Sequence, residues 1–212
     1  DCITSAETMT INRPTFIPND SRWNSQYGLH LIEADLAYDL WDIEGGDLPG
    51  SMEDGEIIVA VADDAMDWDH PDLIENIWQN LGEDADGDGT VLEGQGNTWG
   101  FDPQDQNGID DDGDGYVDNF IGWNFTNDGD ENDPIYSSNS LSHGTSVAGC
   151  VSGMTNNSIG VASVGWSVKL MAFRCSDNGQ YIEYGYNGIL AAAQMGANVI
   201  NCSWGGFGGG NQ

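Results

Sequence analysis

The chain has 212 residues, with 36 acidic side chains against 4 basic ones, so its formal net charge is −32. This charge excludes nucleic acid and anionic membrane surfaces as electrostatic partners. The longest aliphatic run, IIVAVA at residues 57–62, is far shorter than the roughly 20 apolar residues that span a bilayer. The length, the 39% hydrophobic content and the 8 tryptophans predict one folded domain with a sizeable core.

The net charge is unevenly placed, because the chain from Pro134 onward holds two acidic and two basic residues. Such an asymmetry is typical of an acidic tail or a cation-binding region. The four cysteines allow three disulfide pairings, and the sequence assigns none of them. Cys150, Cys175 and Cys202 stand in apolar contexts, which is typical of small buried side chains.

Apolar strands alternate with helical stretches along the chain. The patterns predict strands at residues 56–62, 168–173 and 198–203, and helices at residues 31–42, 143–154 and 182–196. Gly196 is a plausible C-terminal stop for the last helix. The alternation implies right-handed crossovers and a parallel sheet that is covered on both faces, which is an α/β fold.

Candidate chemistry lies where the first strand ends. In open parallel sheets, active sites gather beyond the carboxyl ends of the strands. Asp63 and Asp64 follow the strand, and His143 begins HGTSVAG. A buried carboxylate can hold a histidine in one tautomer and stabilise its protonated form, but the pair needs a nucleophile as its third member. The two aspartates compete for this role, and only the position directly after VAVA favours Asp63; either could instead cap a turn.

Four blocks occur in a fixed order along the chain. They are VAVADDAMDWDHPDL at residues 59–73, SHGTSVAG at 142–149, NNSIGVA at 156–162 and VINCSWGG at 199–206. Together they resemble the subtilisin-like serine peptidases, or subtilases, from about residue 26 to residue 206. The resemblance implies a three-layer α/β fold with a parallel central sheet, and this sheet would be incomplete in the present chain.

The resemblance also implies roles for individual residues. Asp63 would be the orienting acid and His143 the general base of a peptide-hydrolysing endopeptidase. An extended peptide substrate would pair with main chain on both sides, by strand addition. The two edges of that groove would be formed by Ser203, Trp204 and Gly205 on one side and by Gly179 on the other.

The sequence departs from the family pattern at several places. Asp64 and Ala65 stand where the family commonly has Ser or Thr followed by Gly, and Ser146 replaces a frequent histidine. No segment resembles the GTS-x-A block that bears the nucleophile, and the block with the oxyanion-hole asparagine is missing as well. Ser146 and Ser203 both match non-nucleophilic positions. The chain alone is therefore expected to be inactive, with the serine supplied by a C-terminal remainder that is missing or is a second chain.

Two acidic loops, DADGDG at residues 84–89 and DDDGDG at residues 110–115, carry the pattern D-x-D-x-D-G. Alternating carboxylates can converge on one hard cation, and calcium suits a flexible cage of many oxygens better than magnesium. Neither loop is an EF-hand, since the twelfth position is not glutamate in either, and a solvated acidic surface is the alternative. The candidate ligands are Asp84, Asp86, Asp88 and the Thr90 carbonyl in the first loop, and Asp110, Asp112, Asp114, the Tyr116 carbonyl and Asp118 in the second.

The resemblance implies a third calcium site, because NNSIGV matches a loop that holds a structural calcium in subtilases. The alternative is that Asp72 caps a turn after Pro71 and that the loop is an ordinary β-turn. The implied ligands are the side chains of Asp72, Asn157 and Asp20 and the carbonyls of Thr155, Ile159 and Val161.

These observations together predict the N-terminal part of a secreted, calcium-dependent serine endopeptidase. Residues 1–17 would form an N-terminal extension, and residues 18–212 an incomplete peptidase domain with an acidic insertion at about residues 77–120. No redox or nucleotide cofactor is expected, because no fingerprint for one follows a strand. The alternative from another class is a non-catalytic, calcium-binding extracellular module, structural or adhesive, on a degenerate peptidase fold.

Overall fold

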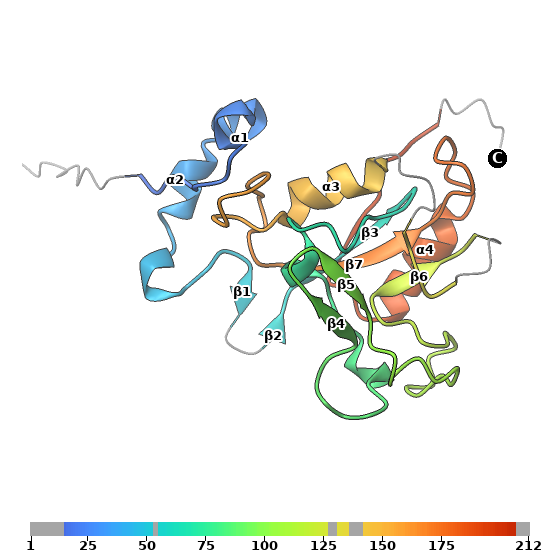
Figure 1. The fold of residues 1–212 in the computed structure, drawn as a ribbon. Coiled ribbons are helices and arrows are strands. Elements are labelled where there is room, and N and C mark those ends of the chain that lie inside the picture. The colour runs from blue at the N-terminus through green and yellow to red at the C-terminus, as the bar shows by residue number, and fades with distance from the viewer. Residues whose placement is uncertain (1–14, 53–54, 127–130, 136–141, 207–212) are drawn as a thin grey trace, which may run out of the picture.

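The computed structural model describes residues 15–52, 55–126, 131–135 and 142–206 (Figure 1). Its centre is a four-stranded parallel sheet in the order β6-β7-β3-β8. The strands are β3 (Ile58–Asp63), β6 (Gly122–Asn124), β7 (Lys169–Arg174) and β8 (Val199–Asn201). The predicted parallel α/β fold is confirmed, and three of these strands lie close to their predicted positions. The sequence patterns gave no indication of β6.

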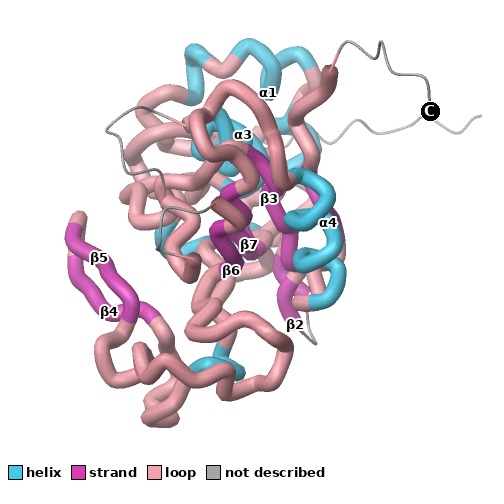
Figure 2. Tube along the Cα trace, turned by 90° about the vertical axis from the view of Figure 1, so that its right-hand side faces the viewer, coloured by secondary structure: helices cyan, strands magenta, loops and turns pink. Residues whose placement is uncertain are grey.

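Two helices cover the opposite faces of the sheet, which gives three layers (Figure 2). These helices are α3 (His143–Ser152) and α4 (Gly185–Gln194). Successive residues of β3 face opposite sides: Val61 packs in one buried cluster with Ala148 of α3, whereas Ala62 packs in another with Ala191 of α4. A strand buried on both faces requires an uninterrupted apolar run, and this is why the run at residues 57–62 is so long.

The C-terminus of α4 is closed by the predicted glycine. Gly196 has a φ of 88°, and the N–H of Ala197 bonds to the Ala192 carbonyl at 3.0 Å. This is the Schellman arrangement, in which a left-handed residue lets the chain turn back onto the last helical turn.

The acidic insertion leaves and re-enters the sheet at neighbouring points. Ile77 forms a bridge with Leu170 of β7, and the chain returns to the same edge of β7 as β6, where Gly122 pairs with Ala172. Between them, the N–H of Asn80 bonds to the Phe120 carbonyl at 2.7 Å and joins the two ends. The insertion contains a hairpin of β4 (Leu92–Gln95) and β5 (Thr98–Phe101), which Figure 1 shows beside the sheet in green.

The predicted helix at residues 31–42 is wrong. Two short helices occupy this region, α1 (Tyr27–Leu31) and α2 (Ala34–Tyr38), because Glu33 between them has a φ of 55°. Left-handed backbone cannot continue a right-handed helix. Several of the apolar side chains that suggested the helix are exposed, namely Leu31, Ile32, Leu36 and Leu40.

A small aromatic cluster fixes the N-terminal part. The ring of Tyr38 packs edge-on against Trp166 at a centroid distance of 4.9 Å, and its hydroxyl donates to the Ser163 carbonyl at 2.7 Å. Trp23 belongs to the same buried cluster. The remaining short elements are β1 (Ser51–Met52), β2 (Gly55–Glu56) and the 3-10 turns Trp23–Ser25, Ile43–Gly45, Ile74–Asn76 and Leu81–Glu83.

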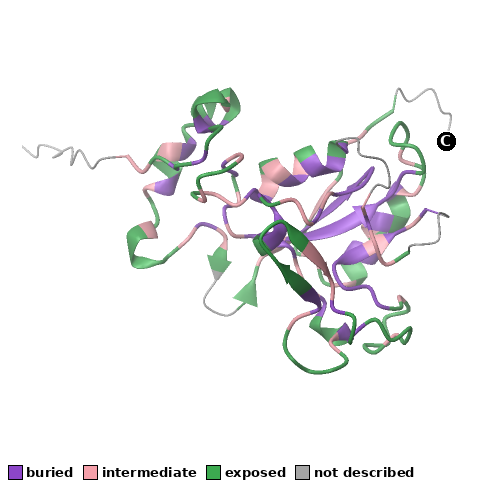
Figure 3. Cartoon of the chain, viewed as in Figure 1, coloured by how far each residue is buried: buried purple, intermediate pink, exposed green. Residues whose placement is uncertain are grey.

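Burial is concentrated in the central sheet and the flanking faces of its helices (Figure 3). The prediction that the three central cysteines are buried is confirmed only for Cys175, because Cys150 and Cys202 are exposed; all three are free thiols. Cys2 lies outside the described residues. None of the described helices is long and apolar enough to cross a membrane.

Candidate active site

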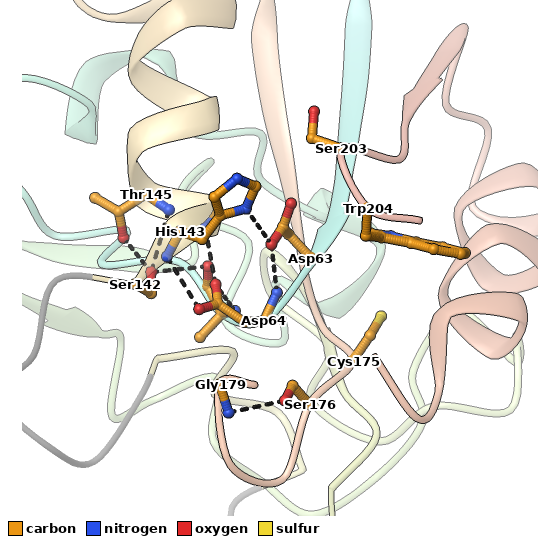
Figure 4. Close-up of polar contacts among 12 residues, drawn as sticks. Asp63, Asp64, Ser142, His143, Thr145, Cys175, Ser176, Gly179, Ser203 and Trp204 are labelled. Atoms are coloured by element: carbon orange, nitrogen blue, oxygen red, sulfur yellow. Dashed lines mark hydrogen bonds and ion pairs between the residues drawn. The ribbon is translucent and has the colours of Figure 1, made fainter. Parts of the chain in front are cut away.

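The candidate site lies where β3 ends and α3 begins, two segments about 80 residues apart in sequence (Figure 4). Gly144, the second residue of α3, allows this close approach. A Cβ at this position would overlap the Ala65 carbonyl oxygen and would lie 2.9 Å from Cβ of Asp63. Only glycine therefore lets the start of the helix sit directly on the end of the strand.

Asp63 and His143 are joined by a hydrogen bond of 2.9 Å between Oδ1 and Nδ1. The Asp63 side chain is 2% exposed, whereas the imidazole reaches solvent. A carboxylate can only accept, so Nδ1 carries the proton and Nε2 is left with its lone pair. The hydrogen bond that His143 donates to Asp63 raises the pKa of His143 above its ordinary value of 6.5, the charges of Asp63 and Asp64 add to this, and partial burial opposes it.

Asp64 contacts the backbone of the helix instead of the imidazole. Its carboxylate accepts the N–H of His143 at 3.0 Å and the N–H of Gly144 at 2.8 Å. Ser142, the N-cap residue, accepts the N–H of Thr145 at 3.1 Å. These N–H groups have no partner within a helix, so Asp64 and Ser142 together cap α3. The two competing aspartates thus make different contacts.

The candidate substrate-binding residues follow the two strands that flank β3. Ser203 and Trp204 come after β8, and Gly179 comes after β7, so they lie on both sides of Asp63 (Figure 4). The indole Nε1 of Trp204 donates to the Ala62 carbonyl at 2.7 Å, which fixes this segment to β3. Gly179 has a φ of 70°, and its N–H donates to Ser176 Oγ at 2.9 Å. Gly205 is exposed at the end of the first segment.

An open groove of about 670 Å³ lies beside His143, between α3 and β8. Its lining is predominantly apolar and consists of Val59, His143, Ser146, Val147, Cys150, Val151, Val164, Gly165, Val168, Val199, Ile200, Asn201 and Ser203. Within the described part of the chain, no hydroxyl or thiol is hydrogen bonded to Nε2 of His143, and the Ser203 hydroxyl donates to Asn201 Oδ1 instead. The described residues therefore provide a hydrogen-bonded Asp–His pair without an aligned nucleophile.

The residues of the third candidate calcium site come together from three segments. Asp72 accepts the Asn157 side-chain amide and the Val161 N–H, both at 2.8 Å. Asp20 accepts the Asn156 N–H at 2.8 Å, and its other oxygen is buried without a partner. Burial raises the pKa of both carboxyls, and the charge of Asp20 raises that of Asp72 further. A cation between the carboxylates would relieve this repulsion.

The loop that carries Asn157 is tightly coiled. Asn156, Ser158 and Gly160 all have positive φ, from 50° to 72°. At Gly160 a Cβ would overlap the Asp72 carboxylate. The loop thus packs its backbone against Asp72, and the carbonyl-bearing candidates Thr155, Ile159 and Val161 belong to this coil.

The two D-x-D-x-D-G loops have the same internal hydrogen bonds. The first aspartate of each, Asp84 or Asp110, accepts the N–H groups of the glycines three and five residues later, at 2.7 to 2.9 Å. At the seventh position, the N–H groups of Thr90 and Tyr116 bond to Asp88 and Asp114, at 3.0 and 2.9 Å. The loops are therefore folded alike without being part of an EF-hand.

Both loops also meet fully buried acidic side chains that the sequence patterns do not identify, two at the first loop and one at the second. Among the residues that the structure describes, three groups of carboxylates have oxygens within 4.8 Å of one another: Glu83, Asp110 and Asp112; Asp84, Asp86 and Asp105; and Asp86, Asp88 and Asp102. Asp114 and Asp118 are in none of them; Asp118 accepts the Gly108 N–H at 3.1 Å. Glu83 contributes to the second loop, yet it directly precedes the first motif in the sequence, and this neighbouring position could have pointed to it. Asp102 and Asp105 follow the β4–β5 hairpin and belong to no motif.

An Asp–His pair at the carboxyl edge of a parallel three-layer α/β sheet is typical of hydrolases that work through an activated nucleophile. The model of the subtilase family matches residues 54–212. The chain belongs to the subtilase family.

Several curated proteins are similar to this chain. Subtilisin-like protease 1 of Plasmodium berghei (strain Anka) is 32% identical over 188 residues, which cover 88% of this chain and 26% of that protein. Halolysin of Haloferax mediterranei is 27% identical over 97% of this chain and 30% of its own length. The extracellular protease of Xanthomonas campestris pv. campestris is 31% identical over 97% of this chain and 33% of its own length. The chain thus spans about a third or less of these relatives.

Proposed function

We propose that this chain is the N-terminal part of the catalytic domain of a secreted, calcium-dependent subtilisin-like serine endopeptidase. The hydrogen bond of 2.9 Å between Asp63 Oδ1 and His143 Nδ1 carries the proposal. It favours Asp63 over Asp64 as the orienting acid, since Asp64 is engaged with the backbone of α3. Family membership supports the class of reaction, and the roles of the individual residues are our inference.

The arrangement fits acyl transfer. His143 Nε2 accepts the proton of a serine hydroxyl as the serine oxygen attacks the peptide carbonyl carbon, and it then donates that proton to the departing amine. Water repeats the sequence on the acyl-enzyme and releases the carboxylic acid. Asp63 stabilises the imidazolium that forms in each half-reaction, which agrees with the raised pKa of His143.

Substrate recognition would use main chain more than side chains. The segments after β7 and β8 flank Asp63, so an extended peptide placed between Gly179 and residues 203–205 can pair with backbone on both sides. Such pairing accepts many side chains and suits an endopeptidase acting on protein substrates. Trp204, fixed to the Ala62 carbonyl, would form a rigid wall of this groove.

The nucleophilic serine would come from a C-terminal remainder of the same protease, as a longer chain or a separate one. Two features support this. Within the described residues, β8 pairs with β3 on one side only, so its other edge can accept a further strand. The groove of about 670 Å³ beside His143 is apolar and open, which suits a packed helix or strand better than a small polar ligand. A serine carried into this groove would lie next to His143.

Calcium dependence is supported by the gathering of carboxylates at three places. Of the described residues, four buried side-chain atoms lack a hydrogen-bond partner, and all are carboxylate oxygens; three belong to the candidate calcium sites, on Asp20, Asp102 and Asp105. Hard cations take such oxygens as ligands. Secretion is supported by the relatives named as an extracellular protease and as an extracellular serine protease, the latter from Natrialba magadii.

The proposal is tested by labelling the complete protease with a fluorophosphonate, which reacts with activated serines. We expect the label on a serine outside residues 1–212 and strongly reduced labelling in the His143→Ala variant. The Asp111→Asn variant, altered at an exposed carboxylate of the second acidic loop, is the matched control and should label like the wild type. If the wild type is folded and no serine is labelled, the protein is the non-catalytic calcium-binding module instead.

A further inference from the structure

The first acidic loop meets two aspartates from the segment after the β4–β5 hairpin. Their carboxylates fall into two overlapping groups of three, one formed by Asp84, Asp86 and Asp105 and the other by Asp86, Asp88 and Asp102. Within each group the oxygens lie within 4.8 Å of one another. Oxygens that bind one calcium at about 2.4 Å can be at most about 4.8 Å apart, so each group has the spacing of a ligand set.

The two aspartates from outside the loop are fully buried, and each is only half satisfied. Asp105 Oδ1 accepts the N–H groups of Ala85 and Asp86 at 2.9 and 3.3 Å, and Asp102 Oδ1 accepts the Gln104 N–H at 2.7 Å. The Oδ2 atom of each has no partner and is inaccessible to solvent. A buried charged oxygen without a partner is strongly destabilising, and a bound cation would supply the positive charge that compensates these two oxygens.

The second loop shows that unpartnered carboxylate oxygens are not a general property of such loops. Glu83 is the buried carboxylate there, and both of its oxygens are used: Oε1 accepts the Asp111 N–H at 3.0 Å and Oε2 accepts the Asp118 N–H at 3.0 Å. The internal hydrogen bonds of the two loops are otherwise alike. The unpartnered oxygens of the first loop therefore need their own explanation.

We propose that the first loop holds two calcium ions, with Asp86 bridging them and with Asp102 and Asp105 each completing one of the two positions. The two groups share only Asp86, and each contains one of the two aspartates that have an unpartnered oxygen. A single ion in either group would leave the other unpartnered oxygen buried without a ligand. Two divalent ions would also neutralise most of the charge of the five carboxylates. This inference rests on the proposed calcium dependence and assigns ligands that the motif does not contain.

The two ions would tie the loop to the hairpin. The Asp102 N–H bonds to the Val91 carbonyl at 3.0 Å, which closes the base of the hairpin. Phe101, the last residue of β5, stacks on Trp68 at a centroid distance of 5.1 Å. Cations held by Asp102 and Asp105 would thus connect an acidic surface loop to an aromatic contact of the core.

The experiment counts calcium ions bound to the chain by native mass spectrometry after chelation and back-titration. We expect Asp102→Asn and Asp105→Asn each to bind one ion fewer than the wild type, and Asp86→Asn to bind two fewer. Asp111→Asn makes the same chemical change outside every group and should bind the full number. Equal numbers for the wild type, Asp102→Asn and Asp105→Asn would overturn the inference.

Thermal unfolding separates loss of ligands from loss of fold. In chelator, Asp102→Asn and Asp105→Asn should melt at or above the wild-type temperature, because each removes an unpartnered buried charge. In calcium both should melt below the wild type. A decrease of the same size in chelator and in calcium would mean a purely structural role and would overturn the inference. These results leave the peptidase proposal untouched, whereas a wild type that binds no calcium would also contradict its calcium dependence.

Discussion

Replacement of Gly144 by alanine tests the close packing that creates the site. The new Cβ would overlap the Ala65 carbonyl oxygen and lie 2.9 Å from Cβ of Asp63, and neither group is the end of a flexible side chain. Overpacking of this kind costs about 1–3 kcal/mol. Alanine is favoured over glycine within helices by up to about 1 kcal/mol, which offsets part of this cost. We expect Gly144→Ala to lower the free energy of unfolding by about 1–2 kcal/mol.

Gly149→Ala, in the same helix, is the matched control. Its Cβ would lie 3.6 Å from Cγ2 of Val161, an ordinary contact, so only the helix preference remains. This variant should be more stable than the wild type by roughly 0.5–1 kcal/mol. In a chain of this length, 1 kcal/mol corresponds to about 2–4 °C in the melting temperature. Urea unfolding of the two variants should therefore give changes of opposite sign.

A Gly144→Ala variant as stable as Gly149→Ala would refute this reasoning, because it would mean that α3 does not press on the end of β3. The position of His143 depends on that contact. The folded fraction of Gly144→Ala should accordingly show a weaker Asp63–His143 hydrogen bond, visible as a lower His143 pKa.

Four further predictions concern the site and its cations. In the complete enzyme, Asp63→Asn should lower kcat by about 10⁴. Asp64→Asn should chiefly cost about 1 kcal/mol of stability, measured by urea unfolding, because an amide oxygen can accept only one of the two N–H groups that Asp64 accepts. The raised His143 pKa stabilises the fold at pH values below its ordinary 6.5, and this contribution should be lost as the pH rises through the raised value, in melting curves from pH 5 to 9. Removing calcium should lower the melting temperature, by the equivalent of about 2.7 kcal/mol from a calcium level of 100 Kd. Gly160→Ala, whose Cβ would overlap the Asp72 carboxylate, should abolish one calcium site in titration calorimetry.

Each of these predictions has a contrary outcome. Equal turnover in wild type and Asp63→Asn would assign the acid elsewhere. A pH profile of stability that is unchanged by Asp63→Asn would separate His143 from Asp63. A melting temperature that does not change on adding chelator would mean that the acidic loops are solvated surface without bound calcium. Calcium binding by Gly160→Ala equal to that of the wild type would exclude a site at Asp72.

The sequence predicted β3 and β7 well because these two strands are buried on both faces. The apolar run before Asp63 could only be a central strand or a buried helix, and its length favoured a strand. The helix at residues 31–42 failed for the opposite reason. Its apolar spacing looked helical, yet Leu31 and Leu40 are 77% and 85% exposed, and the chain turns at Glu33 so that Tyr38 can reach Trp166. Tertiary packing determines the conformation of this segment, and the periodicity of apolar residues along the sequence does not reveal that packing.

The candidate site was predictable in part. The sequence placed both Asp63 and Asp64 at the end of the strand, but only the geometry separates the imidazole partner from the helix cap. The motif marks Asp84, Asp86 and Asp88 as candidate ligands because these residues are close in sequence. Asp102 and Asp105 reach the same loop through the fold of the intervening hairpin, so no local pattern marks them.

The most direct test of the Asp63–His143 pair is the pKa of His143, measured by NMR titration of this chain and assigned with the His143→Ala variant. It requires no nucleophile and no substrate. We expect a value above 6.5 in the wild type that falls clearly in Asp63→Asn and less in Asp64→Asn, since Asp63 contributes both a hydrogen bond and a charge. An identical pKa in the wild type and in Asp63→Asn would contradict the account.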